Sequence, residues 1–278
     1  MAIITYAETN LPDVDEIQST WCFGLPFFDS YGNSIEETSV QKLIDGARRQ
    51  VERHLGIFLK PKLIASNPEE RGLVEGTDYE IAEPPYDYDA KAYANMGFTQ
   101  LRERPVQKIT GLKLVLPNGQ VIVDFLTRPE WVKLYPKSGQ FQIVPYAGDP
   151  TIFSLLGGTQ MGYGFMTGQL NRSVPQMWYI DYIAGYAKNR IPEDIRNIVA
   201  KMVAVDVLGI IGEAYKSGLT GMSTSIDGLS ESVSYTTSAN STLYSAHIKQ
   251  YKEEISDFFD ETKSGVRSSE RGLTFTVL

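Results

Sequence analysis

Apolar residues recur at three- and four-residue steps in three long segments, which predicts three helices. The first is expected to begin at Ser34, because Ser34-Ile35-Glu36-Glu37 has the spacing of a capping box, and to end at Pro61. The second follows Pro192 and is apolar almost all round as far as Ile211, so other elements have to surround it on most sides. The third has an apolar face made of Tyr244, Ile248, Tyr251, Ile255, Phe258 and Phe259.

Between the first two helices the period changes to two, which is typical of strands with one buried face. Leu112, Leu114 and Leu116 precede Pro117-Asn118-Gly119-Gln120, and Val121, Val123 and Phe125 follow it. Because Asn-Gly tolerates the positive φ angles of a tight turn, this pattern predicts a hairpin. Further strands are expected at residues 131–135, 140–144 and 177–186.

These elements predict an α+β fold, in which a helical bundle carries a β-rich inserted subdomain and extended N- and C-terminal arms. Residues 62–104 are rich in Glu, Asp, Tyr and Pro and indicate loops, and the glycine-rich residues 157–168 indicate a mobile loop. The expected domains are an N-terminal arm (1–33), a helical core (34–61 and 178–262), a β-rich and loop-rich insertion (62–177) and a C-terminal arm (263–278).

The charge of the chain bears on nucleic-acid binding. Lys and Arg together number 26 and Asp and Glu 34, which gives a formal net charge of −8, and no basic block stands out. Tight binding to phosphates needs cationic side chains that displace condensed counterions, so a double-stranded DNA-binding regulator is disfavoured. A negatively charged channel surface repels phosphates and lets a DNA duplex pass. The net charge is therefore compatible with a DNA channel and argues against a protein that binds DNA tightly.

Candidate catalytic and metal-binding residues are few. The histidines are His54 and His247, each on a predicted amphipathic helix, where a surface or boundary position is the expectation. With Cys22 as the single cysteine, the chain has no intrachain disulfide and too few ligands for a nitrogen and sulfur metal site, and it suits a reducing cytoplasm. The N-terminal residues show no secretory signal pattern, and no segment has the ~20 apolar residues of a membrane span.

Motifs of nucleotide binding and acyl transfer are incomplete. In Gly162-Tyr163-Gly164-Phe165-Met166-Thr167-Gly168 the third glycine comes one residue too late for a dinucleotide fingerprint, and Gly-Lys-Ser/Thr occurs nowhere. Gly228-Leu229-Ser230-Glu231-Ser232 lacks the second glycine of a nucleophile elbow. We therefore expect no catalytic residue, no metal site and no cofactor.

The acidic residues give two further expectations. Carboxylates are plentiful between Glu69 and Asp89, but nothing in this Pro-rich polar run supplies the desolvation that would separate two pKa values, so a solvated surface is favoured over an acid/base pair.

Asp206 stands alone in the apolar helix. Because an unpaired buried carboxylate costs several kcal/mol, we expect Asp206 to make a buried polar contact, inside the fold or with another subunit.

Three segments, in this order, resemble those of the head-to-tail connector (adaptor) proteins of tailed bacteriophages. They are Ile180-Asp181-Tyr182-Ile183-Ala184-Gly185-Tyr186, then Ile191-Pro192-Glu193-Asp194-Ile195, then Ser225-Ile226-Asp227-Gly228-Leu229-Ser230 before a Tyr-rich helix. The resemblance is strongest over residues 178–255 and extends to the helix at 34–59 and the strands at 106–144. Residues 1–33, 62–104 and 157–168 have no counterpart in it.

The resemblance implies a virion structural protein and no enzyme. Copies of such an adaptor, commonly twelve, form a ring under the portal protein, extend the DNA channel and provide the docking site for the tail. The implied partners are the portal protein, tail or neck proteins and further copies of the chain, while double-stranded DNA passes without sequence-specific binding and no membrane is involved. The implied location is the virion neck, after assembly in the cytoplasm of the host bacterium.

Two segments are expected to contact the portal or adjacent subunits. One contains Ser225, Ile226, Asp227, Gly228, Leu229 and Ser230, and the other contains Leu273, Phe275, Val277 and Leu278. An extended tail of this kind can add as a strand to a neighbour, and the cost of ordering it makes assembly weak in solution and strong on a template.

Two other functions stay open. One, within the same class, is a tail-terminator or baseplate protein. The other is a carbohydrate-active enzyme or sugar-binding module that uses the Tyr- and Asp-rich residues from Tyr79 to Tyr93.

Overall fold

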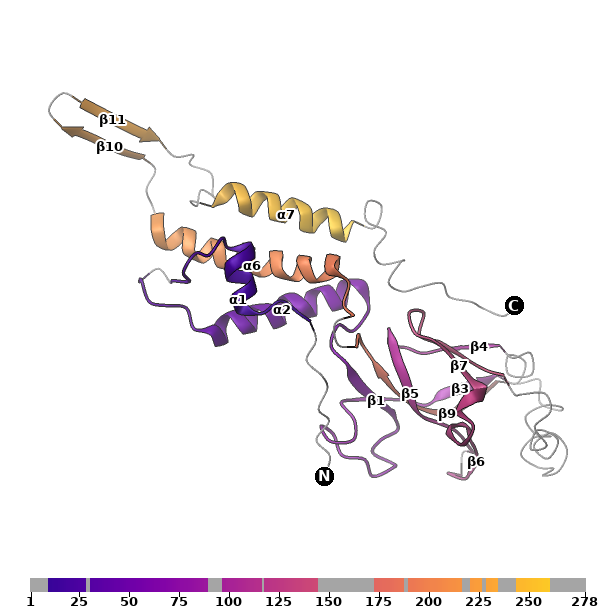
Figure 1. Ribbon diagram of the computed structural model, residues 1–278. Coiled ribbons are helices and arrows are strands. Elements are labelled where there is room, and N and C mark those ends of the chain that lie inside the picture. Colours follow the sequence, from indigo (N-terminus) through magenta and orange to yellow (C-terminus); the bar gives the residue numbers. More distant parts are fainter. Residues whose placement is uncertain are drawn as a thin grey trace. The chain divides into compact units, whose positions relative to one another are not determined.

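The computed structural model describes residues 10–28, 31–89, 97–116, 118–144, 173–187, 190–216, 221–226, 229–234 and 244–260. The chain forms two compact units (Figure 1). Leu55–Arg190 make a unit built mainly of strands, and Asn10–His54 with the described part of Ile191–Val266 make a mainly helical one. The expected mixed α+β fold is confirmed. The chain leaves the helical unit at 54/55 and re-enters it at 190/191, whereas the expected boundaries were 61/62 and 177/178.

The larger sheet of the β-rich unit is arranged around one long strand, β9 (Ser173–Ala184). The strand order is β2-β1-β9-β5-β6, with β3 also paired to β9. β1 and β2 are parallel, and the other pairs are antiparallel. Because β9 lies between β1 and β5, it belongs to the β-rich unit, which moves the domain boundary to 190/191. The remaining strands are β1 (Lys62–Ser66), β2 (Ile81–Glu83), β3 (Tyr86–Asp89), β5 (Val106–Val115) and β6 (Val121–Asp124).

The smaller sheet has the order β4-β8-β7 and is antiparallel throughout. Its strands are β4 (Phe98–Gln100), β7 (Val132–Tyr135) and β8 (Gln140–Ile143). Short turns of 3₁₀ helix, η2 (Phe125–Thr127) and η3 (Pro129–Trp131), precede β7. The core of the unit joins both sheets at Trp178, whose ring centroid lies 5.4 Å from that of Phe125 and 6.4 Å from that of Phe141.

The predicted hairpin is confirmed as β5 and β6. Leu114 faces Val123 in the register, and Leu112 and Leu114 are fully buried. The turn depends on Gly119, which has a φ of +83° and donates its N–H to the Leu116 carbonyl at 2.8 Å. The strands expected at 131–135, 140–144 and 177–186 are also confirmed, as β7, β8 and β9, the last beginning earlier than expected.

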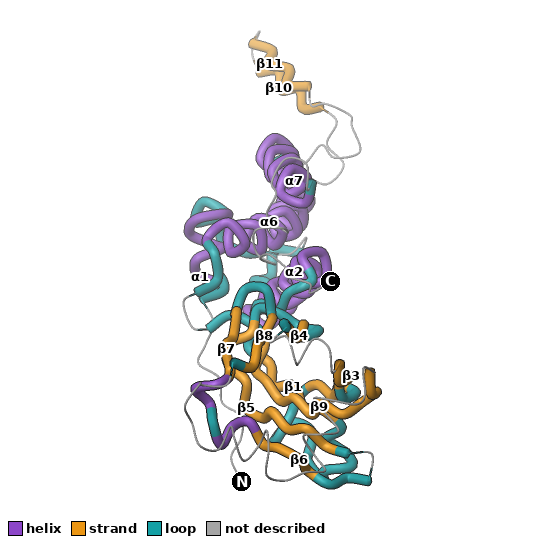
Figure 2. The backbone as a smooth tube through the Cα atoms, turned by 90° about the vertical axis from the view of Figure 1, so that its right-hand side faces the viewer, coloured by secondary structure: helices purple, strands orange, loops and turns teal. Residues whose placement is uncertain are grey.

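The helical unit contains α2 (Glu37–Leu55), α6 (Glu193–Lys216) and α7 (Ser245–Phe259), which confirms the three predicted helices. α2 and α7 lie alongside α6 (Figure 1, Figure 2). α7 runs antiparallel to α6, and an ion pair of 2.5 Å joins Lys201 to Glu254. A short N-terminal segment, α1 (Val14–Glu16) and the π-helical turn η1 (Ile17–Trp21), packs on α6 through an ion pair between Glu16 and Arg196.

The boundaries of α2 differ from the prediction at both ends. Ser34 does not cap the helix but forms an isolated bridge with Phe28, and the Glu36 carbonyl accepts the N–H of Ser39 and of Val40. The helix ends at Leu55 because Gly56, with a φ of +64°, adopts the left-handed conformation that commonly stops a helix.

Candidate interaction surfaces

The segment predicted to contact partners forms a hairpin between α6 and α7. Its strands are β10 (Gly221–Ile226) and β11 (Leu229–Ser234), paired along their whole length, with Ser225 opposite Ser230 and Ile226 opposite Leu229 at the closed end. Asp227 and Gly228 lie outside the described residues. Among the described residues the two strands form a sheet of their own (Figure 1). Because an isolated two-stranded ribbon is only marginally stable in water, this hairpin is suited to packing against something else.

The register divides the hairpin positions into two faces of unlike chemistry. Residues on alternate positions of a strand lie on opposite faces of a sheet. One face has the pairs Met222 with Val233, Thr224 with Glu231 and Ile226 with Leu229. The other face has Gly221 with Ser234, Ser223 with Ser232 and Ser225 with Ser230. By register, one set of positions is therefore apolar except for Thr224 and Glu231, and the other set has only glycine and serine.

A second surface lies on α6. The side of this helix that faces the protein is fully buried, at Ile195, Val199, Val203, Val207, Leu208 and Ile211. Between Met202 and Ile210 the opposite side is exposed or half-buried, and it is apolar except for Asp206. We call it the α6 stripe; its members are Met202, Val205, Asp206, Gly209 and Ile210, of which Ile210 is 40 % exposed. A stripe of this composition on the solvent side of a helix is a candidate surface for a partner.

Asp206 lies on the exposed side of α6 and makes no buried polar contact within the described structure, so a contact with another subunit stays the prediction for this residue. Neighbouring side chains still exclude part of its water, which raises the pKa of its carboxyl, and the positive charge of Lys252 on α7 acts in the opposite direction. The Asp206 carboxylate is tolerated in this apolar helix because it lies on the side that faces solvent.

The first resembling segment, on β9, has a structural role. Both carboxylate oxygens of Asp181 accept hydrogen bonds from the Arg71 guanidinium at 2.7 Å, and Oδ1 also accepts the Ser66 N–H at 3.1 Å. This bidentate pair raises the pKa of Arg71, chiefly through the hydrogen bond. A Cβ at Gly111 would come within 2.4 Å of Asp181 Oδ2, so the neighbouring strand needs a glycine there.

Tyr182, the next residue, organises a buried polar cluster. Its hydroxyl donates to Glu83 Oε1 at 2.9 Å, and the Tyr86 hydroxyl donates to Glu83 Oε2 at 2.8 Å. Arg102 pairs with Glu83 Oε2 at 3.2 Å and places its guanidinium carbon 3.9 Å from the centre of the Tyr86 ring. Burial raises the pKa of both tyrosines well above the usual range, so both hydroxyls remain protonated donors. Glu83 is thus a buried exception among the carboxylates of residues 69–89, which are otherwise exposed or half-buried.

Gly185 completes this segment. It has a φ of +111°, and a Cβ at this position would lie 2.3 Å from the Lys60 carbonyl oxygen. Asp181, Tyr182 and Gly185 therefore hold the β-rich unit together. Their partners Arg71, Glu83 and Arg102 gave no sequence signal, because they are distant along the chain and no local pattern connects them.

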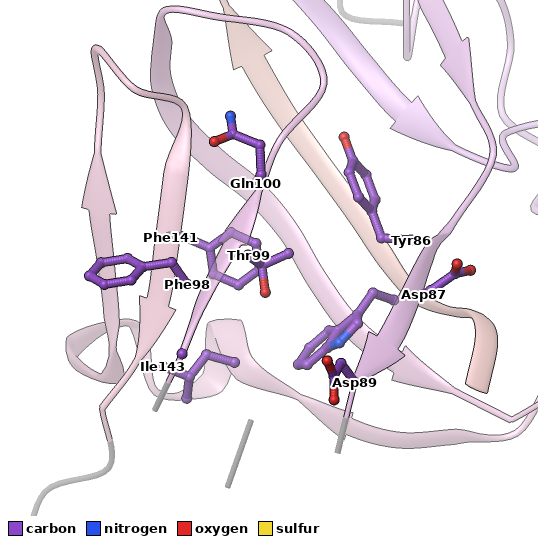
Figure 3. Close-up of a pocket in the computed structure, with 10 residues that line it drawn as sticks. Tyr86, Asp87, Asp89, Phe98, Thr99, Gln100, Phe141 and Ile143 are labelled. Carbon is purple, nitrogen blue, oxygen red and sulfur yellow. The ribbon is translucent and has the colours of Figure 1, made fainter. Parts of the chain in front are cut away.

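A pocket of about 270 Å³ opens beside β3 and β4 in the β-rich unit (Figure 3). Its walls include Phe98, Phe141 and Trp178, together with Asp87 and Asp89. Asp87 Oδ1 accepts the N–H of Gln176, a residue with a φ of +56°, at 3.0 Å. Figure 3 shows the Asp87 carboxylate directed away from Phe141 and Thr99, so Asp87 and Asp89 do not converge as an acid/base pair would.

The other candidate residues have ordinary surroundings. His54 and His247 are exposed, as expected; His54 Nε2 lies 3.2 Å from the Phe259 carbonyl oxygen, and the His247 ring lies 5.0 Å from that of Phe23. Cys22 is buried, which raises the pKa of its thiol to about 12. In the described parts of the chain no cluster of three or more His, Cys, Asp or Glu could hold a metal ion, and no helix is long and apolar enough to cross a membrane.

Other predictions fall outside the described residues. They concern the contacts of Leu273, Phe275, Val277 and Leu278, the glycine-rich loop at 157–168, the C-terminal arm at 263–278, and residues 1–9, 29 and 30 of the N-terminal arm.

No known protein family and no curated protein matches the chain. Among solved structures, it is similar to a chain in the virion of a native gene transfer agent (GTA) particle, with 14 % identity over 89 % of this chain and 92 % of that one and a TM-score of 0.39. It is also similar to a chain in the neck of an empty GTA particle computed with C6 symmetry, with 14 % identity, the same coverage and a TM-score of 0.38. At these TM-scores the likeness assigns neither a fold family nor a function to this chain.

Proposed function

We propose that this chain is a non-enzymatic virion structural protein, a head-to-tail adaptor whose copies form a ring. The ring sits under the portal protein in the neck, extends the DNA channel and provides the docking site for the tail. The helical unit is the ring-forming part, the β-rich unit is its inserted subdomain, and neighbours or the portal bind the hairpin and the C-terminal segment.

The observation that carries this proposal is the α6 stripe beside an amphipathic hairpin. In a protein that functions as a monomer, burial of Met202 and Ile210 would be favourable, and so would pairing of the β10–β11 ribbon with a third strand. Here both surfaces are left incomplete in the described structure. Two incomplete surfaces on one chain fit a building block that is completed by its neighbours, and the hairpin also carries the residues that resemble the adaptor segment.

The charge of the chain supports a channel without DNA recognition. With a formal net charge of −8, the protein repels a duplex, and a ring of copies adds these charges together. We expect the ring to let DNA pass, and we expect the isolated chain not to bind duplex DNA in a salt-sensitive manner.

The direct test is to locate the chain in purified particles. Mass spectrometry should detect it in virions, and imaging at side-chain resolution should place a ring of it between head and tail. A chain absent from particles, or found only at the distal end of the tail, would contradict the proposal. Retention on isolated tails and not on heads would favour a tail-terminator or baseplate protein.

The C-terminal segment has its own test. Deleting residues 273–278 removes the apolar positions Leu273, Phe275, Val277 and Leu278, so heads and tails should accumulate unjoined while the isolated chain keeps its far-ultraviolet circular dichroism. A matched control is Thr274→Ser with Thr276→Ser, which keeps the apolar positions and should join heads to tails. Infectious particles from the deletion at the control's yield would exclude this segment as a contact.

One observation favours a second candidate, a sugar-binding module. The pocket beside β3 and β4 combines aromatic rings with carboxylates, as carbohydrate sites do. Titration of oligosaccharides, followed by tryptophan fluorescence, should show saturable quenching that Asp89→Asn weakens if this candidate is right. An unchanged signal at millimolar sugar would exclude it.

A further inference from the structure

We infer that the apolar face of the β10–β11 hairpin of one copy docks on the α6 stripe of a second copy, in a head-to-tail contact that repeats around an assembly. This inference rests on the proposed ring and names the contact that builds it. The two surfaces are different from each other, and every copy has one of each, so the contact is heterologous and can close into a ring.

The two surfaces match in size. From Met202 to Ile210 an α-helix rises about 12 Å. From the Met222 pair to the Ile226 pair a strand advances about 13 Å. Two strands lie about 4.8 Å apart, so the ribbon spans roughly the width of one helix. The apolar positions of the hairpin can therefore cover the stripe over its whole length.

The surfaces also match in chemistry. The apolar hairpin face offers Met222, Ile226, Leu229 and Val233, and the stripe offers Met202, Val205 and Ile210. Gly209 adds room for close approach, because a Cβ there would meet no atom within 4 Å. The opposite face of the hairpin has only Gly and Ser, which gain little from burial, and this selects the face that docks.

A pair of opposite charges would add specificity to the contact between the hairpin and the stripe. Glu231 is the only charged position on the apolar hairpin face. Beside the stripe, α7 carries the exposed Lys252, whose positive charge acts on Asp206. Pairing Glu231 with Lys252 would place a cation between the two carboxylates and remove the repulsion that Glu231 and Asp206 would otherwise have.

The occupant is a second copy because every copy carries both surfaces, and the two match in length, composition and charge. Ile210 remains 40 % exposed, although its hairpin begins only a few residues after α6 ends. A helix that is apolar on both sides needs a cover, and the chain carries a ribbon of the right length and composition.

Cysteine cross-linking tests the contact. A chain with Ile210→Cys and a chain with Ile226→Cys are mixed, at a concentration where the wild type assembles or within assembled particles, and oxidised. The native Cys22 is buried and its thiol has a pKa of about 12, so the new cysteines dominate the reaction. We expect a covalent dimer of the two variants, at least tenfold more abundant than with Ser225→Cys, which occupies the opposite face one residue away.

Several outcomes would overturn the inference. They are equal cross-linking by Ser225→Cys and Ile226→Cys, no dimer from the mixture, or a double variant with both Ile210→Cys and Ile226→Cys that forms only an intramolecular bond. The last would mean that the hairpin folds back on its own helix.

A second measurement uses association without a covalent bond. Ile210→Asp and Ile226→Asp should each abolish self-association in sedimentation velocity, and a mixture of the two should form a dimer only, because one intact stripe and one intact hairpin remain. Glu231→Lys should weaken association at least tenfold, and Lys252→Glu in the same chain should restore it. If Ser225→Asp disrupts association as strongly as Ile226→Asp, the face assignment is wrong.

Failure of this inference differs from failure of the proposed function. If particles contain a ring of this chain in the neck but the Ile210 and Ile226 cysteines do not cross-link, the inference fails and the adaptor proposal stands. If the chain is absent from particles while the soluble copies cross-link as expected, the adaptor proposal fails and the contact stands as a self-association surface.

Discussion

Tyr182 and Glu83 show how a few polar side chains stabilise the β-rich unit. Glu83 is almost fully buried and accepts hydrogen bonds from two tyrosines and an arginine. A buried carboxylate with this many partners is favourable only while all of them are present, because losing one leaves a charge without compensation.

Replacing Tyr182 with Phe should therefore lower the free energy of unfolding by about 1–3 kcal/mol, since Glu83 Oε1 and the Glu103 N–H both lose a partner. Urea denaturation of both proteins measures the difference. The matched control is Tyr179→Phe on the same strand, whose hydroxyl accepts one long bond of 3.4 Å from Asn67. The control should change stability by less than about 0.5 kcal/mol, and an equal loss in both variants would refute the role of the cluster.

Glu103 gives the cluster a pH dependence. Burial and then the negative charge of Glu83 raise the pKa of Glu103 in the folded protein. The folded state therefore holds this proton more tightly than the unfolded state, and the contribution of Glu103 to stability falls as the pH rises from about 4.3 through the raised pKa. Glu103→Gln should remove that fall, which urea midpoints measured across the same pH range would detect. A parallel pH profile for variant and wild type would contradict this.

At this scale the sequence predicted exposed positions better than buried ones. His54 and His247 are at the surface because amphipathic periodicity identifies the outer face of a helix. Glu83 looked like one more solvated carboxylate, since its partners come from distant strands. For Asp206 the sequence left two contacts open, one inside the fold and one with another subunit, because a helix that is apolar all round does not reveal which side faces water.

At the scale of elements, the part of α6 from Met202 to Ile211 has apolar residues on two sides that differ in burial. Leu208 is fully buried and Ile210, two residues later, is 40 % exposed. The same chemistry on the same helix therefore contributes differently to folding, because only the buried side chain leaves a cavity when it is shortened.

Leu208→Ala should destabilise the protein by about 2–5 kcal/mol, whereas Ile210→Ala should cost less than about 1 kcal/mol in the same assay. Chemical denaturation of both variants, at a concentration where the wild type is monomeric, gives the comparison. If Ile210→Ala costs as much as Leu208→Ala in the monomer, the stripe is part of the core and cannot be a docking surface.

The long helices and the strands from β5 to β9 could be predicted from the sequence, whereas β1 to β4 lie in residues 62–104, which were expected to be loops. Period two located β5 to β8, and period 3.6 located α2, α6 and α7, because burial on one face selects for these periods. The start of α2 was misplaced because Ser34 satisfies a capping pattern but pairs with Phe28 instead. The hairpin β10–β11 was not predicted, since half of its positions are serine or glycine and Thr224 and Glu231 interrupt the apolar positions that alternate with them.

At the scale of the whole molecule, the chain forms two compact units. In the β-rich unit a cluster of buried residues gathers around Trp178, and in the helical unit buried apolar residues line α6. The chain enters the β-rich unit after α2 and returns before α6, so the helical unit is assembled from two distant parts of the sequence. The sequence suggested this arrangement through the resemblance and through the change of period. The second boundary lies later in the chain than expected, because β9 belongs to the β-rich unit.

Two compact units predict separate responses to mutation, provided that each unit unfolds as its own cooperative block. In differential scanning calorimetry, Tyr182→Phe should lower the midpoint of one transition and Leu208→Ala that of the other, each by several degrees. Each variant leaves the second transition as an internal control, since it changes no residue in that unit. If both variants shift one common transition by similar amounts, the units unfold together, and the insertion would then have to be treated as part of the ring-forming body. Two independent transitions would instead allow the β-rich unit to be altered while the helical unit keeps its capacity to assemble.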